Sequence, residues 1–387
     1  MADNLRTLRV EKLSSHGEGI AFSEGRAVFI PHSIPEELVL CRIVEEHASF
    51  VRAELVDVQE PSPQRVEPPC PLFGLCGGCA LQHIEYTYQT KLKQDAAAET
   101  FLRIGGFDPG KLEIVTGEPY HYRNRIQIHA CGDGGLGFTK AGSRETIRAA
   151  QCPILAPVLE HWLIAENRKA RPYRALSALI GERPRFSVFG QNEHISIEGK
   201  DVYASAEVRG ENFQFPVAHF FQSNLHMLEE LISRCIEPLE GGRALDLYSG
   251  AGLFSLFLAD KFDSIECVES DTASMEAARL NLSWAKAKVG FSDIPVERWI
   301  KTPHAHRAFD CIVADPPRSG LSPELRAWLS GAQADLLLYV SCDHASFARD
   351  LHDLLQKGWT IEYITLFDFY PQTGRLEVVA RLARGAR

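Results

Sequence analysis

The sequence lacks any apolar run of about 18 residues, the minimum for a transmembrane helix, so we expect no membrane span. The first residues, MADNLRTLRVEKLSSHG, have no long apolar core and no small-residue cleavage site, so we expect no secretory signal. We therefore expect a cytoplasmic chain. Thiols stay reduced in that compartment, which argues against a disulfide framework for the ten cysteines.

An excess of positive charge is also missing, because 41 Lys and Arg face 51 Asp and Glu, giving a net charge of −10. A protein that binds nucleic acid through bulk charge alone is basic, so this chain needs a local basic surface for such a role. HYRNRIQIH, residues 121–129, and ENRKARPYR, residues 166–174, are two candidates, although either is also compatible with an ordinary solvated face. We expect an RNA-binding face that includes Arg123 and Arg125.

The first 60 residues have the pattern of a small β-barrel. Five short runs, TLRVEKL, GIAFS, RAVFIP, ELVLCRIVEE and FVRAELVDV, are separated by Gly, Pro and acidic residues, and several of them alternate apolar with polar positions. Five short strands in this span are typical of an OB-type barrel. The proline-rich stretch QEPSPQRVEPPCP then indicates a linker, so we expect the first domain to comprise residues 1–60.

The rest of the chain divides near residue 210. Residues 83–107 are predicted to form a helix that ends at a Gly pair, and residues 112–215 mix strand-like runs with turns and one helix, LEHWLIAENRKA. From about residue 225, strands alternate with helices, which predicts a parallel sheet covered on both faces. We therefore expect an α/β protein with a central α+β domain at 61–210 and a Rossmann-like domain at 211–387.

A strand, a glycine turn and a helix are predicted in ALDLYSGAGLFSL, residues 244–256, and this is where a Rossmann-like sheet receives a nucleotide. The turn contains Gly250 and Gly252 but neither the third glycine of G-x-G-x-x-G nor a P-loop, so a pyrophosphate ligand does not fit. S-adenosylmethionine, which has an adenosine and no phosphate, fits better. Glu269, at the end of the next strand, is placed to accept hydrogen bonds from ribose hydroxyls.

Reactive side chains stand at the predicted ends of later strands. Asp315 ends one strand in IVADPPRSGL, and Cys342 ends the next in LLLYVSCDHAS. A cysteine before a helix N-terminus lies near dipoles that favour its thiolate, although a lone cysteine of this kind is more often passive. Glu377 stands near the start of the last strand in YPQTGRLEVVA.

These residues resemble the RNA 5-methyluridine (uracil-5-) methyltransferases of the RumA/TrmA type, nearly end to end. GEGIAFSEGRAVFIPHSIPEE is similar to a TRAM domain, and six further stretches match the family in spacing and order: YRNRIQI, FFQSN, LDLYSGAGLFSL, ADPPRSGL, YVSCDHASFARDL and YPQTGRLEVVA. The resemblance implies a class I methyltransferase that binds S-adenosylmethionine. The contacts that it implies come from Gln222, Tyr248, Glu269 and Asp315, together with the glycine turn.

The resemblance also assigns Cys342 as nucleophile and Glu377 as base. Addition of a thiolate to carbon 6 of uracil makes carbon 5 nucleophilic, and a base must then remove the proton from carbon 5. The target base has to leave its stack, so a flipped or single-stranded uridine is expected. The family often has Asn-Pro after the cysteine and His before the base, whereas this chain has Asp343-His344 and Arg375.

Three cysteines, Cys70, Cys76 and Cys79, lie close together in PPCPLFGLCGGCALQH. A tetrahedral metal site needs four ligands, so either nearby His83 completes a zinc site or the fourth ligand is distant. Cys152, followed by proline as iron–sulfur ligands sometimes are, is the distant candidate. Family members with clusters have this three-plus-one arrangement, so the resemblance implies a [4Fe–4S] cluster on Cys70, Cys76, Cys79 and Cys152.

Three other functions fit the sequence less well. A small-molecule methyltransferase needs neither the barrel nor the pair of Cys342 and Glu377, and a non-catalytic RNA-binding protein has no use for that pair. Cytosine methylation usually requires a second cysteine in the DPP region, which is absent.

Because family members with both barrel and cluster act on ribosomal RNA, the resemblance favours 23S rRNA, with tRNA as the alternative. We expect RNA as partner, no membrane, and a monomer.

Overall fold

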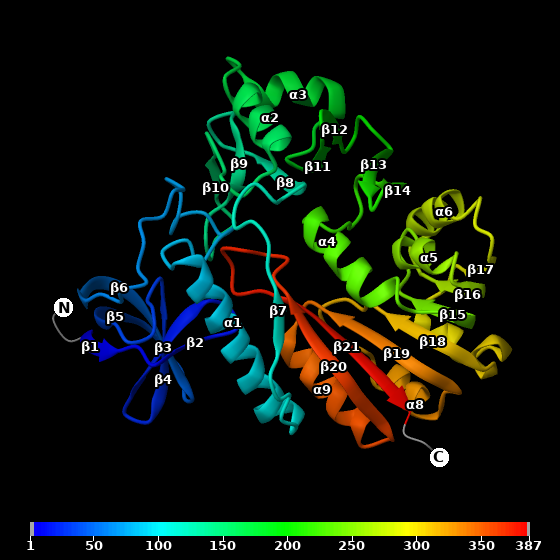
Figure 1. The fold of residues 1–387 in the computed structure, drawn as a ribbon. Helices are drawn as coiled ribbons and strands as arrows, with labels where there is room; N and C mark the ends of the chain where they lie inside the picture. The colour runs from blue at the N-terminus through cyan, green and yellow to red at the C-terminus, as the bar shows by residue number, and fades with distance from the viewer. Residues whose placement is uncertain (1–3, 385–387) are drawn as a thin grey trace.

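The computed structural model describes residues 4–384, which form an N-terminal barrel, a central sheet, a hairpin and a C-terminal sheet (Figure 1). Figure 1 places the barrel at the left, the five-stranded central sheet at the top and the eight-stranded sheet at the lower right. Among the described residues, no helix is long and apolar enough to cross a membrane, as the sequence predicts.

The barrel contains six strands in the order β1-β5-β6-β4-β3-β2. Their bounds are β1 Leu5–Arg9, β2 Lys12–Leu13, β3 Glu18–Ser23, β4 Arg26–Pro31, β5 Leu38–Glu46 and β6 Phe50–Glu60. The two edge strands, β1 and β2, are separated by only Val10 and Glu11, so this continuous segment closes the sheet on itself. All five predicted strand runs are present, and the first is divided into β1 and β2.

The next segment connects the barrel to the C-terminal sheet. Residues 61–85 are mostly loop, followed by α1 (Tyr86–Thr100), the short π-helix η1 (Phe101–Gly105) and β7 (Glu113–Val115). The predicted helix ends at the Gly pair, where Gly106 adopts a left-handed φ of 66°. β7 pairs with β20 at the edge of the eight-stranded sheet, so the first elements of the expected central domain share the C-terminal core.

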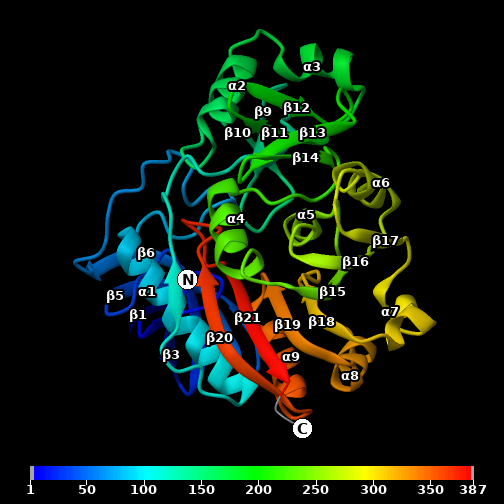
Figure 2. The same ribbon diagram turned by 45° about the vertical axis from the view of Figure 1, so that its right-hand side comes forward.

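The central sheet has the order β10-β9-β8-β11-β12, and two helices accompany it. The bounds are β8 Arg125–Ala130, β9 Leu136–Thr139, β10 Thr146–Arg148, α2 Pro157–Asn167, α3 Pro172–Ile180, β11 Arg185–Gln191 and β12 His194–Ile197. The core between sheet and helices includes Ile128, Leu159 and Phe186. The predicted helix LEHWLIAENRKA is confirmed as α2. The hairpin of β13 (Tyr203–Val208) and β14 (Glu211–Pro216) lies between this sheet and α6 (Figure 2).

The C-terminal sheet has the order β17-β16-β15-β18-β19-β21-β20-β7. Its chain comprises α4 Leu225–Leu231, η2 Ile232–Ile236, β15 Gly241–Leu247, α5 Leu253–Leu258, β16 Phe262–Val268, α6 Thr272–Asn281, β17 Lys288–Ser292, α7 Val296–Trp299, η3 Pro303–His306, β18 Phe309–Ala314, α8 Pro323–Gly331, β19 Ala334–Ser341, α9 His344–Leu355, β20 Trp359–Phe367 and β21 Glu377–Arg384. Two separate hydrophobic clusters, one around Phe254 and one around Phe347, cover its faces. The predicted Rossmann-like alternation is confirmed.

One strand differs from the expected parallel arrangement. β21 inserts between β19 and β20 and runs antiparallel to both. The alternation of helices and strands predicts parallel neighbours, but no helix separates β20 from β21, so the chain returns in the opposite direction. This insertion places the start of β21 beside the end of β19.

Candidate active site and cysteine cavity

The glycine turn after β15 approaches the end of β16. Gly250 and Gly252 have φ values of 54° and 81°, a left-handed conformation that favours glycine. The amide of Gly250 donates to Oε2 of Glu269 over 3.1 Å, while Oε1 of Glu269 accepts from the amide of Asp271 over 2.8 Å. A side chain added at Gly250 would meet no heavy atom within 4 Å, so the turn has open space beside it.

Gln222 lies in the loop before α4, and Tyr248 directly follows β15. Gln222 is 8% exposed, and its Oε1 finds no hydrogen-bond partner within residues 4–384. Tyr248 follows β15 with a left-handed φ of 62°, and its hydroxyl donates to Oε1 of Glu297 over 3.5 Å. A buried acceptor without a partner and an open glycine turn fit an adenosine-containing ligand such as S-adenosylmethionine.

Asp315 follows β18, as the sequence predicts, and its amide donates to the carbonyl of Leu247 over 3.4 Å. Burial raises the pKa of Asp315 to about 7. Asp246, one strand away on β15, also has a pKa raised to about 7 by burial, although its Oδ2 accepts from the amide and hydroxyl of Ser255. The carboxyl ends of β15 and β18 therefore carry acids that hold their protons at unusually high pH.

Cys342 and Glu377 lie at adjacent strand ends. The register of β19 and β21 pairs Ser341 with Val378, so the next position along each strand brings Cys342 opposite Glu377. Glu377 is 3% exposed, and burial followed by the charge of Asp315 raises its pKa well above the usual value. The Tyr370 hydroxyl donates to Oε1 of Glu377 over 3.4 Å.

The expectation of a dipole-stabilised thiolate at Cys342 is wrong for the protein without ligands. Burial, followed by the nearby charges of Glu377 and Asp315, raises the pKa of Cys342 to about 12. The helix that follows is capped by Asp343, whose Oδ1 accepts from the amide of Ser346 over 2.8 Å. A carboxylate therefore occupies the N-terminus of α9, and burial of the thiol outweighs any stabilisation from the helix dipole.

The sequence did not predict a role for two residues of this site, Arg318 and Tyr370. Arg318, in the loop after Asp315, lowers the pKa of Cys342 through its charge and a hydrogen bond. Tyr370 contacts Glu377 from the loop before β21. Arg318 belongs to the motif ADPPRSGL, but a single arginine in a loop has no signal that separates it from an ordinary surface residue.

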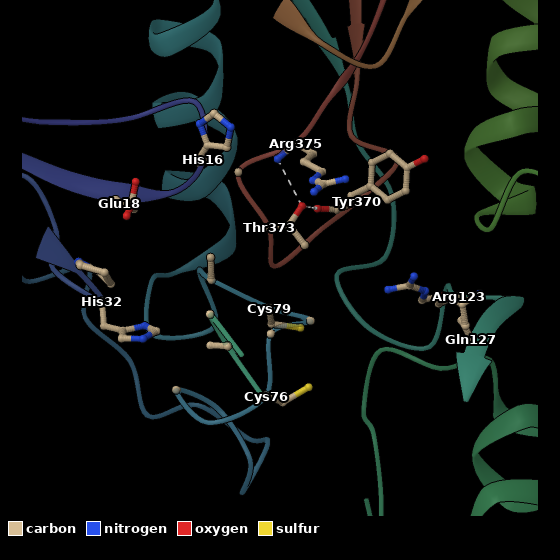
Figure 3. A pocket seen from close by; sticks show the side chains of 18 of the residues that line it. His16, Glu18, His32, Cys76, Cys79, Arg123, Gln127, Tyr370, Thr373 and Arg375 are labelled. Atoms are coloured by element: carbon tan, nitrogen blue, oxygen red, sulfur yellow. Dashed lines mark hydrogen bonds between the residues drawn. The ribbon is translucent and has the colours of Figure 1, made fainter. Parts of the chain in front are cut away.

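A cavity of about 1220 Å³ lies beside these residues. His16, Glu18 and His32 line it from the barrel, while Arg123 and Tyr370 line it from other parts of the chain (Figure 3). Its lining includes five arginines and two glutamates: Arg52, Arg123, Arg125, Arg318, Arg375, Glu18 and Glu54. The acidic chain therefore has a locally basic cavity, as nucleic-acid binding requires.

The two arginines predicted for RNA binding have different surroundings. Arg123 donates through Nε to the carbonyl of Arg125, and it lines both the large cavity and a smaller one lined by cysteines. Arg125 donates through Nη2 to the carbonyl of His219 over 2.6 Å and to Oγ of Ser187 over 3.2 Å. The guanidinium of Arg125 therefore braces neighbouring backbone. The other candidate, residues 166–174, supplies no lining residue, and its Lys169 pairs with Glu166.

The four cysteines singled out in the sequence, Cys70, Cys76, Cys79 and Cys152, line one cavity of about 50 Å³. All ten cysteines of the chain fall within the described residues, and all are free. Burial raises the pKa of Cys79 to about 11 and that of Cys152 to about 12, and Arg123 opposes both shifts. The four thiols therefore lie around one cavity, although Cys152 is distant from the other three in the sequence.

The described residues of this region do not form a site for a single metal ion. Within residues 4–384, no group of three or more His, Cys, Asp or Glu side chains is arranged to hold one ion. His83 does not line the cysteine cavity, and its ring packs instead against those of His32 and Phe73, at centroid distances of 5.9 and 5.5 Å. The zinc alternative that includes His83 is therefore not supported within the described residues.

Comparison with known proteins identifies the family of this chain. The profile of the tRNA (uracil-5-)-methyltransferase family matches residues 186–384, and that of the TRAM domain matches residues 5–56. The chain belongs to the tRNA (uracil-5-)-methyltransferase family. It is therefore an S-adenosylmethionine-dependent methyltransferase with an N-terminal TRAM domain.

Relatives of this family match over most of the chain. An uncharacterized RNA methyltransferase of Treponema denticola is 32% identical, over 93% of this chain and 94% of the relative. The 23S rRNA (uracil(1939)-C(5))-methyltransferase RlmD of Shewanella sp. (strain W3-18-1) is 30% identical, over 97% of this chain and 94% of the relative. The resemblance drawn from the sequence is confirmed at the level of the uracil-5-methyltransferase family.

A solved structure has the same fold. The tRNA (uracil-54, C5)-methyltransferase of Pyrococcus abyssi, in complex with S-adenosyl-L-homocysteine, superposes with a TM-score of 0.74 at 22% identity. The match covers 98% of this chain and 100% of that chain. It confirms the mixed α/β fold with a Rossmann-like methyltransferase sheet.

Proposed function

We propose that this chain methylates carbon 5 of a uridine in 23S ribosomal RNA through a covalent bond between Cys342 and carbon 6 of the uracil. The observation that carries the proposal is the antiparallel register of β19 and β21, which sets Cys342 opposite Glu377. Both residues adjoin Tyr370 and Arg318, which line the basic cavity. A nucleophile and a base therefore act on the same flipped base.

The proposed reaction begins with the Cys342 thiolate. Arg318 favours the thiolate, and bond formation to carbon 6 makes carbon 5 nucleophilic. S-adenosylmethionine supplies the methyl group on a positively charged sulfonium. Glu377 then removes the remaining proton from carbon 5, and the sulfur of Cys342 leaves carbon 6 so that the aromatic ring is restored. The raised pKa of Glu377 suits this step, because its carboxylate is a stronger base than an exposed one.

The proposed contacts to S-adenosylmethionine come from the strand ends of the C-terminal sheet. They are Gln222, Tyr248, Gly250, Gly252, Glu269 and Asp315. The unpartnered Oε1 of Gln222 is available to a ligand donor, and Glu269 already spans the glycine turn where ribose hydroxyls are expected. The open space beside Gly250 allows close approach of the ligand to the backbone.

We also propose a [4Fe–4S] cluster on Cys70, Cys76, Cys79 and Cys152. The cluster, when bound, would serve as a covalent brace between the loop after the barrel and the segment before α2, because uracil methylation needs no electron transfer. We also propose three units, a barrel at residues 1–60, a central unit at 61–210 that holds the cluster and a methyltransferase unit at 211–387, with β7 of the central unit paired to the methyltransferase sheet. Arg123 adjoins both the cysteine cavity and the RNA cavity, so the brace supports the RNA-binding wall.

The choice of 23S rRNA rests on relatives that are named 23S rRNA methyltransferases. They match this chain over nearly their whole length. A tRNA substrate is the second candidate, favoured by the family profile and by the Pyrococcus abyssi structure, both of which carry tRNA in their names. We also propose a cytoplasmic location and a monomer, both of which are expected from the sequence.

Mass spectrometry of nucleosides from purified 23S rRNA and tRNA tests the substrate. Cells without the gene should lose 5-methyluridine from 23S rRNA alone, and the wild-type gene should restore it while a Cys342→Ala gene should not. Loss from tRNA alone would replace the proposed substrate with the alternative. Unchanged 5-methyluridine in both pools would overturn the proposed function.

A further inference from the structure

Tyr370 stands between Glu377 and the large cavity. Glu377 is 3% exposed and does not line the cavity, whereas Tyr370 lines it and donates its hydroxyl to Oε1 of Glu377 over 3.4 Å. Figure 3 shows Tyr370 on the cavity wall across from the barrel residues His16 and Glu18. Tyr370 therefore contacts the buried carboxyl group through its hydroxyl and is itself part of the wall of a space that can hold water.

The position of Tyr370 is fixed by bonds to its own backbone and to that of its neighbours. Nζ of Lys93 donates to the carbonyl of Tyr370 over 3.2 Å. The hydroxyl of Tyr122 donates to the carbonyl of Pro371 over 2.9 Å, and Nδ2 of Asn224 donates to that of Phe369 over 3.1 Å. Three separate parts of the chain thus hold the backbone of this segment.

A buried base has to lose its proton before it can act again. In the proposed mechanism, Glu377 ends each turnover as a neutral acid that carries the proton from carbon 5. Arg318 lies near Glu377, but a guanidinium has no site that accepts a proton in proteins. Asp315 also lies near, but a proton passed to this second buried acid has not yet left the site.

We propose that Tyr370 transfers the proton of Glu377 to water in the cavity after each methylation. This inference rests on the proposed role of Glu377 as base. Once Glu377 is protonated, its hydrogen bond with Tyr370 reverses, so that the acid donates to the phenol oxygen. The O–H bond of the Glu377 acid then breaks as its proton bonds to the phenol oxygen, while the original phenol proton moves to a water molecule. Glu377 returns to its carboxylate, Tyr370 remains a neutral phenol, and one hydronium ion leaves through the cavity, so charge and atoms balance.

The surroundings of Tyr370 suit a neutral relay. Glu377, Cys342 and Asp315 oppose loss of its proton by their negative charge, and only Arg123 among the charged groups that act on its hydroxyl favours it. A lasting phenolate is therefore disfavoured. Concerted transfer, in which one proton arrives as another departs, avoids that species.

Removal of the hydroxyl alone tests the relay. Tyr370→Phe keeps the ring, and rapid-quench kinetics with RNA and S-adenosylmethionine in excess separate the first turnover from later ones. The first turnover should stay within about twofold of wild type, because the relay acts only after Glu377 has taken the proton from carbon 5. Steady-state turnover should fall about 10²- to 10⁴-fold, the usual contribution of a proton transfer by a positioned side chain, giving a burst of product.

Two controls keep the test specific. Tyr363→Phe, on β20, removes a hydroxyl that interacts with Cys235 and Arg381, and it should show neither the slow steady state nor the burst. Replacement of Tyr370 by 3-fluorotyrosine retains the hydroxyl and should restore steady-state turnover to within about twofold of wild type. Failure of that replacement to restore turnover would contradict the relay.

The result can also separate failure of the relay from failure of the proposed function. Glu377→Gln should trap the methylated covalent complex in the first turnover, and absence of that complex would reject Glu377 as the base. A trapped complex in Glu377→Gln, together with a first turnover slowed as much as the steady state in Tyr370→Phe, would mean that Tyr370 orients Glu377 and exports no proton. Unchanged kinetics in Tyr370→Phe would also reject the relay.

Discussion

Nζ of Lys93 lies 2.7 Å from Oδ1 of Asp368, and both side chains are completely buried. Lys93 belongs to α1 and Asp368 follows β20, so the ion pair joins the helix after the barrel to the segment that leads to Glu377. The hydroxyl of Tyr86 adds a hydrogen bond to Oδ2 of Asp368 over 3.0 Å. This pair therefore couples the position of α1 to the geometry of the active site.

Removing one partner of this ion pair should lower the free energy of unfolding more than removing both charges does. Asp368→Asn leaves the ammonium of Lys93 buried without a counter-charge, and it should lower the free energy of unfolding by about 3–5 kcal/mol. Lys93→Met combined with Asp368→Asn should cost less than Asp368→Asn alone. Urea denaturation measures both. Equal losses in the single and double variants would show that uncompensated charge is not the cause.

Arg318 should control the reactivity of Cys342. Because the pKa of this thiol is raised to about 12, its thiolate fraction in the ligand-free protein should increase about tenfold for each pH unit between 7 and 9. Alkylation by iodoacetamide, followed at the Cys342 peptide by mass spectrometry, should show that slope. Arg318→Ala should slow the reaction at every pH, because it removes the group that lowers the pKa. Arg307→Ala, at an exposed position before β18, is the control and should not slow it. A faster reaction in Arg318→Ala would be inconsistent with the site described.

Arg123 and Arg125 should differ in the effect of their removal. Arg123→Ala should weaken RNA binding and reduce the salt slope of the logarithm of affinity by about one, as loss of one phosphate contact does. Arg125→Ala should mainly lower thermal stability, because its guanidinium braces the carbonyl of His219. Filter binding across salt concentrations and thermal melting provide the two measurements. A reduced slope in Arg125→Ala alone would reverse the assignment.

The cysteine cavity should hold iron and sulfide. Protein purified without oxygen should be brown and contain about four iron and four sulfide per chain, as a [4Fe–4S] cluster requires. Ser in place of Cys70, Cys76, Cys79 or Cys152 should abolish the visible absorbance. Cys131→Ser alters a buried cysteine that directly follows β8 and lies outside the cavity, and it should keep the colour. Zinc without iron in colourless protein would rule the cluster out.

Local patterns were sufficient for much of the fold and part of the site. Alternation and turn residues predict the barrel strands, and a strand followed by Gly250 and Gly252 predicts the cofactor turn. The order of strands in the sheet is different, because it depends on contacts between distant segments. The sequence places Cys342 and Glu377 at strand ends but does not contain the antiparallel insertion of β21 that makes them neighbours.

Interactions that depend on burial were the hardest to predict. A helix dipole suggests a thiolate at Cys342, yet the surrounding protein and two carboxylates raise its pKa to about 12. Arg125 is a residue type that often contacts RNA, but its guanidinium donates to the backbone carbonyl of His219. Tyr370 gains its importance only from its distance to Glu377, which no spacing in the sequence reveals.

Peptide mapping of a trapped complex tests the central claim most directly. The protein is incubated with S-adenosylmethionine and RNA that contains 5-fluorouridine, whose fluorine cannot leave as a proton, and the digested complex is analysed by mass spectrometry. The account predicts a methylated 5-fluorouridine bonded to the Cys342 peptide, dependent on S-adenosylmethionine and absent in Cys342→Ala. No adduct, or an adduct on another cysteine, would contradict it.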